Sequence, residues 1–300
     1  MAPSGPAEAG PYVRSRAYLA LAGAGCLWGT GFLLGKFALR ELQVPHMIMY
    51  RLLLACVGFV PVLLSRSVRV QRQDWRTVII AGVFGVPLVY LIQFEGLART
   101  TVAHASLMVA TMPILLGVGA ALLARERVPL RRWMLLLISA IGALLIVSGS
   151  AAGGEARGPT ALGDGLVVLS LLAGVGWVMT SKHLMARYDP IGVGALVTVI
   201  GTVPLVIWVL SVNGVPPVHL TVGAWAPLVV QGLFATTAAN LLWNWGVSRV
   251  PMSEAGVFVN LEPVVGTLLG MIVLGDRLGW SGAAGALLII GAAVGVTQQE

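Results

Sequence analysis

The chain has 300 residues, of which 57% are hydrophobic and only 10% are charged, and its mean hydropathy is +0.90. Soluble domains carry about 25% charged residues, so this composition excludes a protein whose main solvent is water. In a soluble protein the formal net charge of +7 would suggest nucleic-acid binding. Here the arginines lie in short loops between apolar segments, so we interpret them as determinants of membrane orientation and expect no nucleic-acid partner.

Ten segments are apolar enough to cross a bilayer as helices, which takes about 20 residues each. In chain order they cover residues 17–39, 45–65, 76–97, 101–124, 130–150, 161–183, 190–211, 222–247, 252–274 and 280–297. Residues 1–13 are expected to form a disordered cytoplasmic tail. Residues 151–160 are expected to link two halves, residues 14–150 and 161–300. The sequence therefore predicts an all-α integral membrane protein with ten transmembrane helices.

Basic residues predict how this bundle sits in the membrane. Lys and Arg are concentrated in and beside the loops on the side that carries both termini, and few fall on the other side. Short loops rich in Lys and Arg stay in the cytoplasm. We therefore expect a multi-pass protein of the plasma membrane with both termini in the cytoplasm and the lipid bilayer as its main partner.

The second half of the sequence resembles the first. At a shift of 150 residues Gly96 lies over Gly246 and Pro113 over Pro263, and at a slightly smaller shift Lys36 meets Lys182 and Pro45 meets Pro190. Each half then holds five helices. Because five is odd, the second half must be inverted relative to the first. Inverted repeats are a recurrent architecture of secondary transporters.

Four motifs give the chain a family resemblance. They are Trp28-Gly29 followed by Lys36, Arg51 near the start of the second helix, Met112-Pro113 with Arg125-Glu126-Arg127, and Leu261-Glu262-Pro263 with Leu274-Gly275-Asp276-Arg277. In order and duplication these motifs resemble the drug/metabolite transporter superfamily, in its EamA branch, over nearly the whole chain. The resemblance implies ten helices, inverted repeats, and export or exchange of small organic molecules. Two departures are Asp276, where the family commonly has Glu, and Gly174, which lies at the position matching Trp28.

The ninth predicted helix carries an ionisable group about half-way along its length. A charge there costs a few kcal/mol, so Glu262 needs a reason to be present. Pro263 removes one backbone hydrogen bond and frees carbonyls beside the carboxylate. The carboxylate is a candidate for binding a proton, a cation or a substrate ammonium. The alternative is a structural ion pair with a neighbouring helix. Asn260 is a further candidate close by, and Pro113 with Pro263 are expected to kink their helices.

Polar residues on the eighth predicted helix share one face. Thr237, Asn240 and Asn244 are spaced three and four residues apart, which places them on one side of a helix. They face the bundle interior either as substrate ligands or as contacts between helices. In the repeat alignment Asn240 lies over Tyr90, and Gln93 lies one turn from Tyr90 on the same face.

Several other residues are candidates for either a structural or a functional role. Lys36 and Arg51 lie near the outer ends of their helices, where snorkelling to the headgroups is the usual explanation, and an outer gate or a site for a substrate carboxylate is the alternative. Glu254 is expected at the membrane interface. The candidates for a substrate-binding wall are aromatic or hydroxyl-bearing side chains that lie within the predicted helices: Trp28, Thr30, Thr111 and Trp177.

Two rival classes of function can be weighed. Gly279-Trp280-Ser281-Gly282 has the spacing of an intramembrane serine protease, but no histidine follows it and Ser281 fits a helix N-cap. A channel would need charged rings or a filter sequence, and neither is present. We expect no enzyme activity, no catalytic residue, no cofactor and no metal site. GxxxG pairs such as Gly31–Gly35 indicate close packing within or between protomers, which leaves a homodimer open.

The sequence thus favours a secondary transporter, an exporter or exchanger that works by alternating access. We expect a central cavity lined by the first, third, fourth, sixth, eighth and ninth helices. Because the cavity candidates are mostly amides, hydroxyls and aromatics, the expected substrates are small neutral or amphipathic metabolites such as amino acids, with a proton as a candidate coupled ion. Drugs, sugars and nucleosides are the alternative substrates on the same fold.

Overall fold

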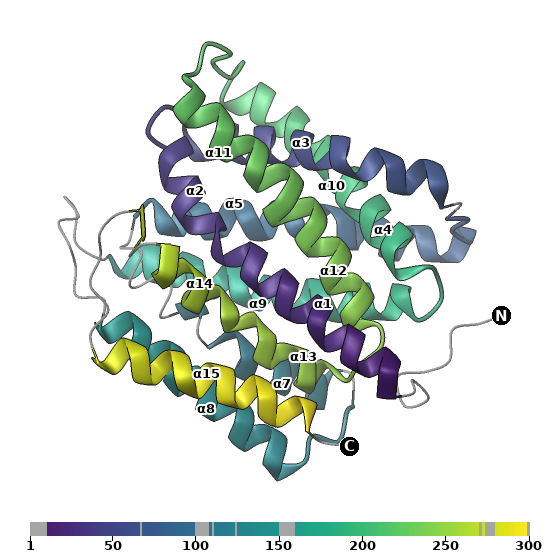
Figure 1. The fold of residues 1–300 in the computed structure, drawn as a ribbon. Coiled ribbons are helices and arrows are strands. Elements are labelled where there is room, and N and C mark those ends of the chain that lie inside the picture. Colours follow the sequence, from purple (N-terminus) through teal and green to yellow (C-terminus); the bar gives the residue numbers. More distant parts are fainter. Residues whose placement is uncertain are drawn as a thin grey trace.

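The computed structural model describes residues 11–66, 68–99, 108–109, 111–123, 125–149, 160–269, 272–273 and 280–298. These residues form helices and contain no strand (Figure 1). In chain order the elements are α1 (Pro11–Gly29), α2 (Gly31–Ala38), α3 (Val44–Ser65), η1 (Arg72–Asp74), α4 (Trp75–Val83), α5 (Val86–Leu97), α7 (Met112–Leu122), α8 (Leu130–Gly149), α9 (Ala161–Met185), α10 (Pro190–Val212), α11 (Val222–Gly232), η2 (Leu233–Ala238), α12 (Ala239–Val247), α13 (Met252–Val259), α14 (Leu261–Leu269) and α15 (Trp280–Thr297).

These helices follow the order predicted from the sequence. Seven stretches of the described chain are long and apolar enough to cross a membrane: Tyr12–Ala38, Val44–Ser65, Arg72–Leu97, Ala161–Met185, Pro190–Val212, Val222–Val247 and Trp280–Thr297. Helix α7, helix α8 and the pair α13–α14 supply the remaining three predicted spans. Parts of those spans, residues 101–107, 110, 124, 150, 270–271 and 274, lie outside the described residues. The all-helical membrane fold is therefore confirmed.

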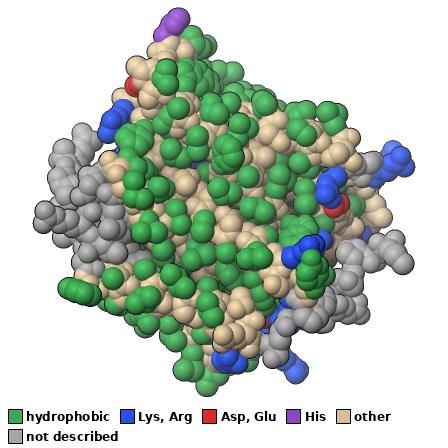
Figure 2. Space-filling model, in the orientation of Figure 1, with side chains coloured by type: hydrophobic (Ala, Val, Ile, Leu, Met, Phe, Trp, Pro, Cys, Tyr) green, Lys and Arg blue, Asp and Glu red, His purple; other side chains and the backbone are tan. Residues whose placement is uncertain are grey.

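The outside of the bundle is apolar. Large side chains such as Leu64 (83% exposed) and Leu122 (73%) point away from the protein. Figure 2 shows hydrophobic side chains over the middle of the molecule, with Lys and Arg gathered mainly toward one end. That end also carries the start of α1 and the end of α15 (Figure 1), and we call it the terminal face. An apolar belt between charged ends is the surface that a bilayer requires.

Several predicted spans are broken into two helices, which the hydropathy pattern did not predict. The first span breaks at Thr30, the third at Phe84-Gly85 and the ninth at Asn260. Pro87 has no N–H, so it cannot continue the hydrogen-bond ladder past the third break. The first helix also begins at Pro11, inside the segment predicted to be a tail. The eighth span stays continuous but holds a π-helical segment, η2.

Side chains form hydrogen bonds at the breaks in the first and ninth spans. The fully buried Gln231 donates from Nε2 to the Gly31 carbonyl at 2.6 Å, and Thr30 donates to the Leu27 carbonyl at 2.7 Å. At the ninth span, Asn260 Nδ2 donates to Ser139 Oγ on α8 at 3.1 Å. A break within a membrane needs such partners, because no water is present to replace the lost backbone bonds.

Pro113 and Pro263 occupy matching places. Each lies in the first turn of the helix that follows an irregular point, Pro113 in α7 after Thr111 and Pro263 in α14 after Asn260. A proline is tolerated in a first turn because its missing N–H would have no partner there anyway. The predicted kinks are thus helix boundaries at both prolines.

The packing of the helices repeats between the two halves. Helix α1 of the first half packs along α12 of the second, and the equivalent pair, α9 of the second half and α5 of the first, packs in the same way. Two helices of the first half pack against their own counterparts, α3 on α10 and α8 on α15, and α7 packs against α13, the helix before its counterpart α14. The α8–α15 pair lies at one side of the bundle and α3–α10 at the other (Figure 1). This pattern is that of the predicted inverted repeat.

The duplicated glycines Gly96 and Gly246 lie at the equivalent crossings. A Cβ on Gly96 would lie 2.9 Å from the Gly163 carbonyl oxygen of α9, and a Cβ on Gly246 would lie 3.0 Å from the Ala17 carbonyl oxygen of α1. Both crossings therefore bring backbone against backbone. This explains why glycine appears at both positions of the repeat: a side chain there would push the paired helices apart.

Loops tie the halves together at both ends of the α3–α10 side. Away from the terminal face, Glu41 accepts hydrogen bonds from the hydroxyl and the N–H of Thr221, and these bonds hold the pKa of the exposed Glu41 carboxyl below its usual range. On the terminal face Arg66 pairs with Asp189 at 2.7 Å and Arg187 with Asp74 at 2.6 Å. The contacts at the two ends join equivalent pairs of loops, as an inverted repeat requires.

We predict that Gly246→Leu destabilises the bundle by about 1–3 kcal/mol, because the new side chain meets the α1 backbone and cannot be accommodated by a rotamer change alone. Gly96→Leu should have a similar effect at the α5–α9 crossing. Gly176→Leu is the matched control, since nothing lies within 4 Å of a Cβ at that position. Thermal unfolding of the purified proteins in detergent measures the difference. Equal melting temperatures for all three variants would contradict the prediction.

Candidate functional site

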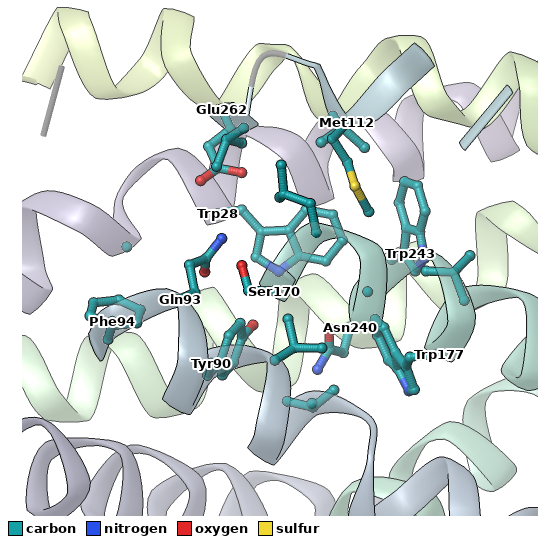
Figure 3. Close-up of a pocket in the computed structure, with 18 of the residues that line it drawn as sticks. Trp28, Tyr90, Gln93, Phe94, Met112, Ser170, Trp177, Asn240, Trp243 and Glu262 are labelled. Atoms are coloured by element: carbon teal, nitrogen blue, oxygen red, sulfur yellow. The ribbon is translucent and has the colours of Figure 1, made fainter. Parts of the chain in front are cut away.

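A cavity lies inside the bundle between the two halves (Figure 3). It has a water-accessible volume of about 110 Å³. Its walls come from α1, α3, α5, α7, α9, α12, α13 and α14, with one residue each from the start of α2 and the stretch before α7. In terms of the predicted spans these are the first, third, fourth, sixth, eighth and ninth, together with the second, which was not predicted to take part.

The second span contributes Arg51, whose side chain is only 2% exposed. Its Nε donates to Thr236 Oγ1 at 2.8 Å, and Nη2 donates to the Ala235 carbonyl at 3.4 Å. The guanidinium lies 3.9 Å from the centroid of the Tyr90 ring and 5.6 Å from that of Phe94. The snorkelling interpretation of Arg51 is therefore wrong. The side chain turns inward because two aromatic faces and a π-helical carbonyl replace the water it loses.

Glu262 enters the same cavity from the first turn of α14. In Figure 3 its carboxylate and the amide of Gln93 point toward one another across the cavity. No ion pair or hydrogen bond to a described residue is present at either carboxylate oxygen, and Arg51 lies in the same cavity wall. The structural ion pair considered from the sequence is therefore absent among the described residues.

Aromatic side chains form much of the remaining wall. The rings of Trp28 and Trp243 lie with their centroids 5.2 Å apart, and Trp177 and Tyr90 line the cavity from α9 and α5. The indole N–H groups of Trp28 and Trp177 are buried, and neither has a hydrogen-bond partner among the described residues. An aromatic wall with a few convergent polar groups is typical of a small-molecule site.

Asn240 is the amide that was predicted to face the cavity, and it does line it. The residue is 1% exposed, and both its Oδ1 and its Nδ2 lack a partner within the described part of the chain. A buried amide without partners costs about 1–3 kcal/mol per group. Ser170 also lines the cavity, but its hydroxyl already donates to the Val167 carbonyl at 2.6 Å.

The repeat alignment places residues of the cavity wall in pairs. Trp28 corresponds to Gly174, Gly31 to Trp177, Tyr90 to Asn240, Gln93 to Trp243, and Met112 to Glu262. All ten residues line the cavity. Its outline is therefore repeated across the pseudo-twofold axis, whereas its chemistry is different on the two sides.

Comparison with known proteins identifies the family. The model of the EamA-like transporter family matches residues 15–148 and again residues 161–298. The chain belongs to the EamA-like transporter family. It is therefore a membrane transporter of the drug/metabolite superfamily, and the predicted resemblance is confirmed.

Individual relatives agree with this assignment. An "Uncharacterized transporter" of Archaeoglobus fulgidus is 25% identical over 88% of this chain and 92% of its own length. The "Uncharacterized transporter YetK" of Bacillus subtilis is 24% identical over 92% of this chain and 84% of its own length. A solved crystal structure superposes with a TM-score of 0.79 at 22% identity, covering 94% of this chain and 96% of that one, and this likeness shows the shared fold.

Other predicted site residues of the EamA-like transporter do not line the cavity. Thr30, Thr111 and Asn260 lie at helix breaks, where the two threonine hydroxyls donate to the Leu27 and Met108 carbonyls. Lys36 is exposed near the end of α2. Pro113 and Pro263 are buried beside the cavity.

Thr237 and Asn244 belong to contacts between helices. Thr237 Oγ1 donates to the Ala55 carbonyl of α3 at 3.0 Å. The Asn244 side chain packs so closely on α10 that a Cβ on Gly194 would lie 1.9 Å from its Nδ2. The shared face of the eighth span is therefore divided, with Asn240 alone of the three reaching the cavity.

Sequence reasoning did not assign Trp243, Phe94, Ser170 or Met112 to the site, although all four line the cavity. For Trp243 and Met112 a signal was available: in the repeat alignment they face Gln93 and Glu262, which were candidates. Phe94 and Ser170 carried no such signal, because an apolar ring or a serine within a membrane helix is most often ordinary packing.

A network of charged residues joins the two halves at the terminal face. Glu254, which is fully buried, pairs with Arg132 at 2.5 Å and with Arg14 at 3.3 Å, and accepts a hydrogen bond from Tyr18 at 2.7 Å. Glu254 thus lies at the terminal face, but it is enclosed by protein there and not exposed. Two arginines and a tyrosine from the first half replace its hydration, and no local sequence pattern indicates them.

Glu126 extends this network. It lies 3.5 Å from Arg132 and accepts hydrogen bonds from the Met252 N–H at 3.1 Å and from the Ser253 hydroxyl. The carboxylate thereby satisfies donors at the N-terminus of α13, where negative charge is favoured. We call Arg14, Tyr18, Glu126, Arg132, Ser253 and Glu254 the terminal-face network.

We predict that Glu254→Gln lowers the stability of the transporter by about 3 kcal/mol, because it leaves Arg14 and Arg132 with one carboxylate fewer in a partly buried setting. Glu95→Gln is the matched control: Glu95 pairs with Arg99 at the surface, where such a pair contributes about 0–1 kcal/mol. Thermal melting of both variants in the same detergent checks the prediction. A melting temperature for Glu254→Gln no lower than that of Glu95→Gln would refute it.

Proposed function

We propose that the protein is a secondary carrier that exports or exchanges small neutral or amphipathic metabolites, amino acids among them, by alternating access. The observation that carries the proposal is the cavity between the two halves, in which aromatic walls surround a few polar groups. Trp28, Tyr90, Gln93, Trp177 and Asn240 are the proposed substrate contacts.

The composition of the cavity supports this substrate range. It holds one cationic and one anionic side chain, Arg51 and Glu262, and its other polar groups are uncharged. A substrate with several phosphates would need more than one basic group to replace its hydration. Small solutes with an apolar part and a few polar groups match these walls better.

The terminal-face network supports alternating access over a permanently open channel. It links the start of α1 and the start of α8 in the first half with the start of α13 in the second. Contacts of this kind between repeats are able to close one end of a cavity and to break when the repeats rock against each other. A continuous pore would not need them.

We place the terminal face in the cytoplasm of a plasma-membrane protein. The excess of Lys and Arg at that end supports this orientation. The roles proposed for the residues away from the cavity are structural: Thr30, Thr111, Asn260, Pro113 and Pro263 shape the helix breaks, Thr237 and Asn244 hold helices together, and Lys36 meets the headgroups.

We expect counterflow of labelled neutral amino acids in proteoliposomes containing the purified protein, and a loss of about tenfold or more in apparent affinity for Asn240→Ala, which removes two polar groups from the cavity. Thr198→Ala, a buried change on α10, which does not line the cavity, is the control and should leave exchange intact. Absence of exchange for every amino acid, with folded wild-type protein, would refute the substrate range.

Alternating access has its own test. In a background with Cys26→Ser and Cys56→Ser, a single Met112→Cys reports on access to the cavity. We expect Glu254→Gln to increase labelling by a membrane-impermeant thiol reagent applied from the terminal face, because the network that closes this face is weakened. Glu95→Gln should not. Labelling that is unchanged by Glu254→Gln would count against a gating role for the network.

A further inference from the structure

The two charged residues of the cavity are each found in one repeat only. At the place of Glu262 the first repeat has Met112, and at the same distance from Pro190 as Arg51 is from Pro45 the second repeat has Leu196. At each of these two positions, one repeat has a charged residue and the other has an apolar one.

Arg51 has no carboxylate partner in the described part of the chain. Its described partners are the Thr236 hydroxyl, the Ala235 carbonyl and the face of Tyr90. These groups hold the guanidinium in place and direct it, but none of them is a carboxylate. The charge of Glu262 acts on it across the cavity without a direct contact. A buried cation in this state favours any ligand that brings an anionic group to it.

Glu262 likewise has no direct partner of opposite charge among the described residues. Its carboxylate faces the cavity from α14, without a hydrogen bond or an ion pair to any described residue. Both charges therefore line the same cavity without contacting each other, since no N–O distance within 4 Å joins them among the described ion pairs. Gln93 and the aromatic rings of Tyr90 and Trp28 line the same cavity.

We propose that the cavity selects zwitterions: Arg51 binds the carboxylate of the substrate, Glu262 binds its ammonium group, and the aromatic wall contacts its apolar part. The inference rests on the proposed function and narrows it to substrates that carry both charges. A zwitterion gives both buried charges a direct ionic partner at once, whereas an amine alone or an acid alone leaves one of them without such a partner.

Three probes with one apolar group separate these possibilities: phenylalanine, 2-phenylethylamine and 3-phenylpropionate. Binding is measured by the change in tryptophan fluorescence of the purified protein, because Trp28, Trp177 and Trp243 line the cavity. We expect wild-type protein to bind phenylalanine about 10- to 100-fold more tightly than either analogue, the range for charge-assisted hydrogen bonds.

The two single substitutions should shift the preference among the probes in opposite directions, one toward the acid and one toward the amine. Glu262→Gln should lose about tenfold or more in affinity for phenylalanine and gain relative preference for 3-phenylpropionate. Arg51→Met, which keeps an apolar chain over Tyr90, should shift the preference toward 2-phenylethylamine. The double variant should fold as well as either single variant, because it removes the two opposite buried charges together. Glu41→Gln and Arg16→Gln, at exposed positions, are charge-matched controls that should leave the order unchanged.

The outcomes distinguish this inference from the proposed function. If wild-type protein binds and exchanges phenylalanine but Glu262→Gln and Arg51→Met weaken all three probes equally, the zwitterion inference is overturned and the carrier proposal survives. The same holds if wild-type protein binds the three probes equally. If folded wild-type protein neither binds phenylalanine nor exchanges any amino acid, the proposed substrate range itself fails.

Discussion

The absence of water inside a bilayer is the constraint on which the rest of this structure depends. Every backbone N–H and C=O in the membrane must find a partner within the protein. At the break in the first span a buried side chain meets that demand, because Gln231 donates to the Gly31 carbonyl. At the break in the ninth span the Asn260 side chain donates to the Ser139 hydroxyl and links the break to α8. Because the first and ninth spans break next to the cavity, the breaks bring irregular backbone and polar side chains to the one place where a solute needs them.

Close backbone contact determines how the two halves combine. Gly96 and Gly246 let α5 approach α9 and α12 approach α1 without an intervening side chain. These equivalent crossings build the walls on either side of the cavity, so a duplicated sequence motif produces a duplicated outline. The side chains on that outline then differ from repeat to repeat, as Met112 and Glu262 illustrate. Repetition thus supplies the shape of the cavity, and divergence supplies its chemistry.

Charge is distributed in this protein according to the partners that tertiary structure provides. At the terminal face Glu254 is fully buried, but two arginines and a tyrosine surround it. In the cavity Arg51 and Glu262 are held by neutral groups or by none among the described residues. The ion pairs of Glu254 stabilise one relative position of the repeats. The cavity charges favour a ligand that pairs with them.

The sequence by itself determined the number and order of the spans, the inverted repeat and the family, because apolar length, repeated motifs and loop charge are local properties of the chain. It also indicated Trp28, Tyr90, Gln93, Trp177, Asn240, Arg51 and Glu262 as candidates, all of which line the cavity. Only the tertiary structure decided that Asn240 reaches the cavity while Thr237 and Asn244, on the same helix, contact α3 and α10. It likewise decided that Arg51 turns inward and that Glu254 is buried. The physical reason is the same in each case: the environment of these side chains is made by helices that are distant in sequence, and periodicity along one helix does not specify which neighbour it will meet.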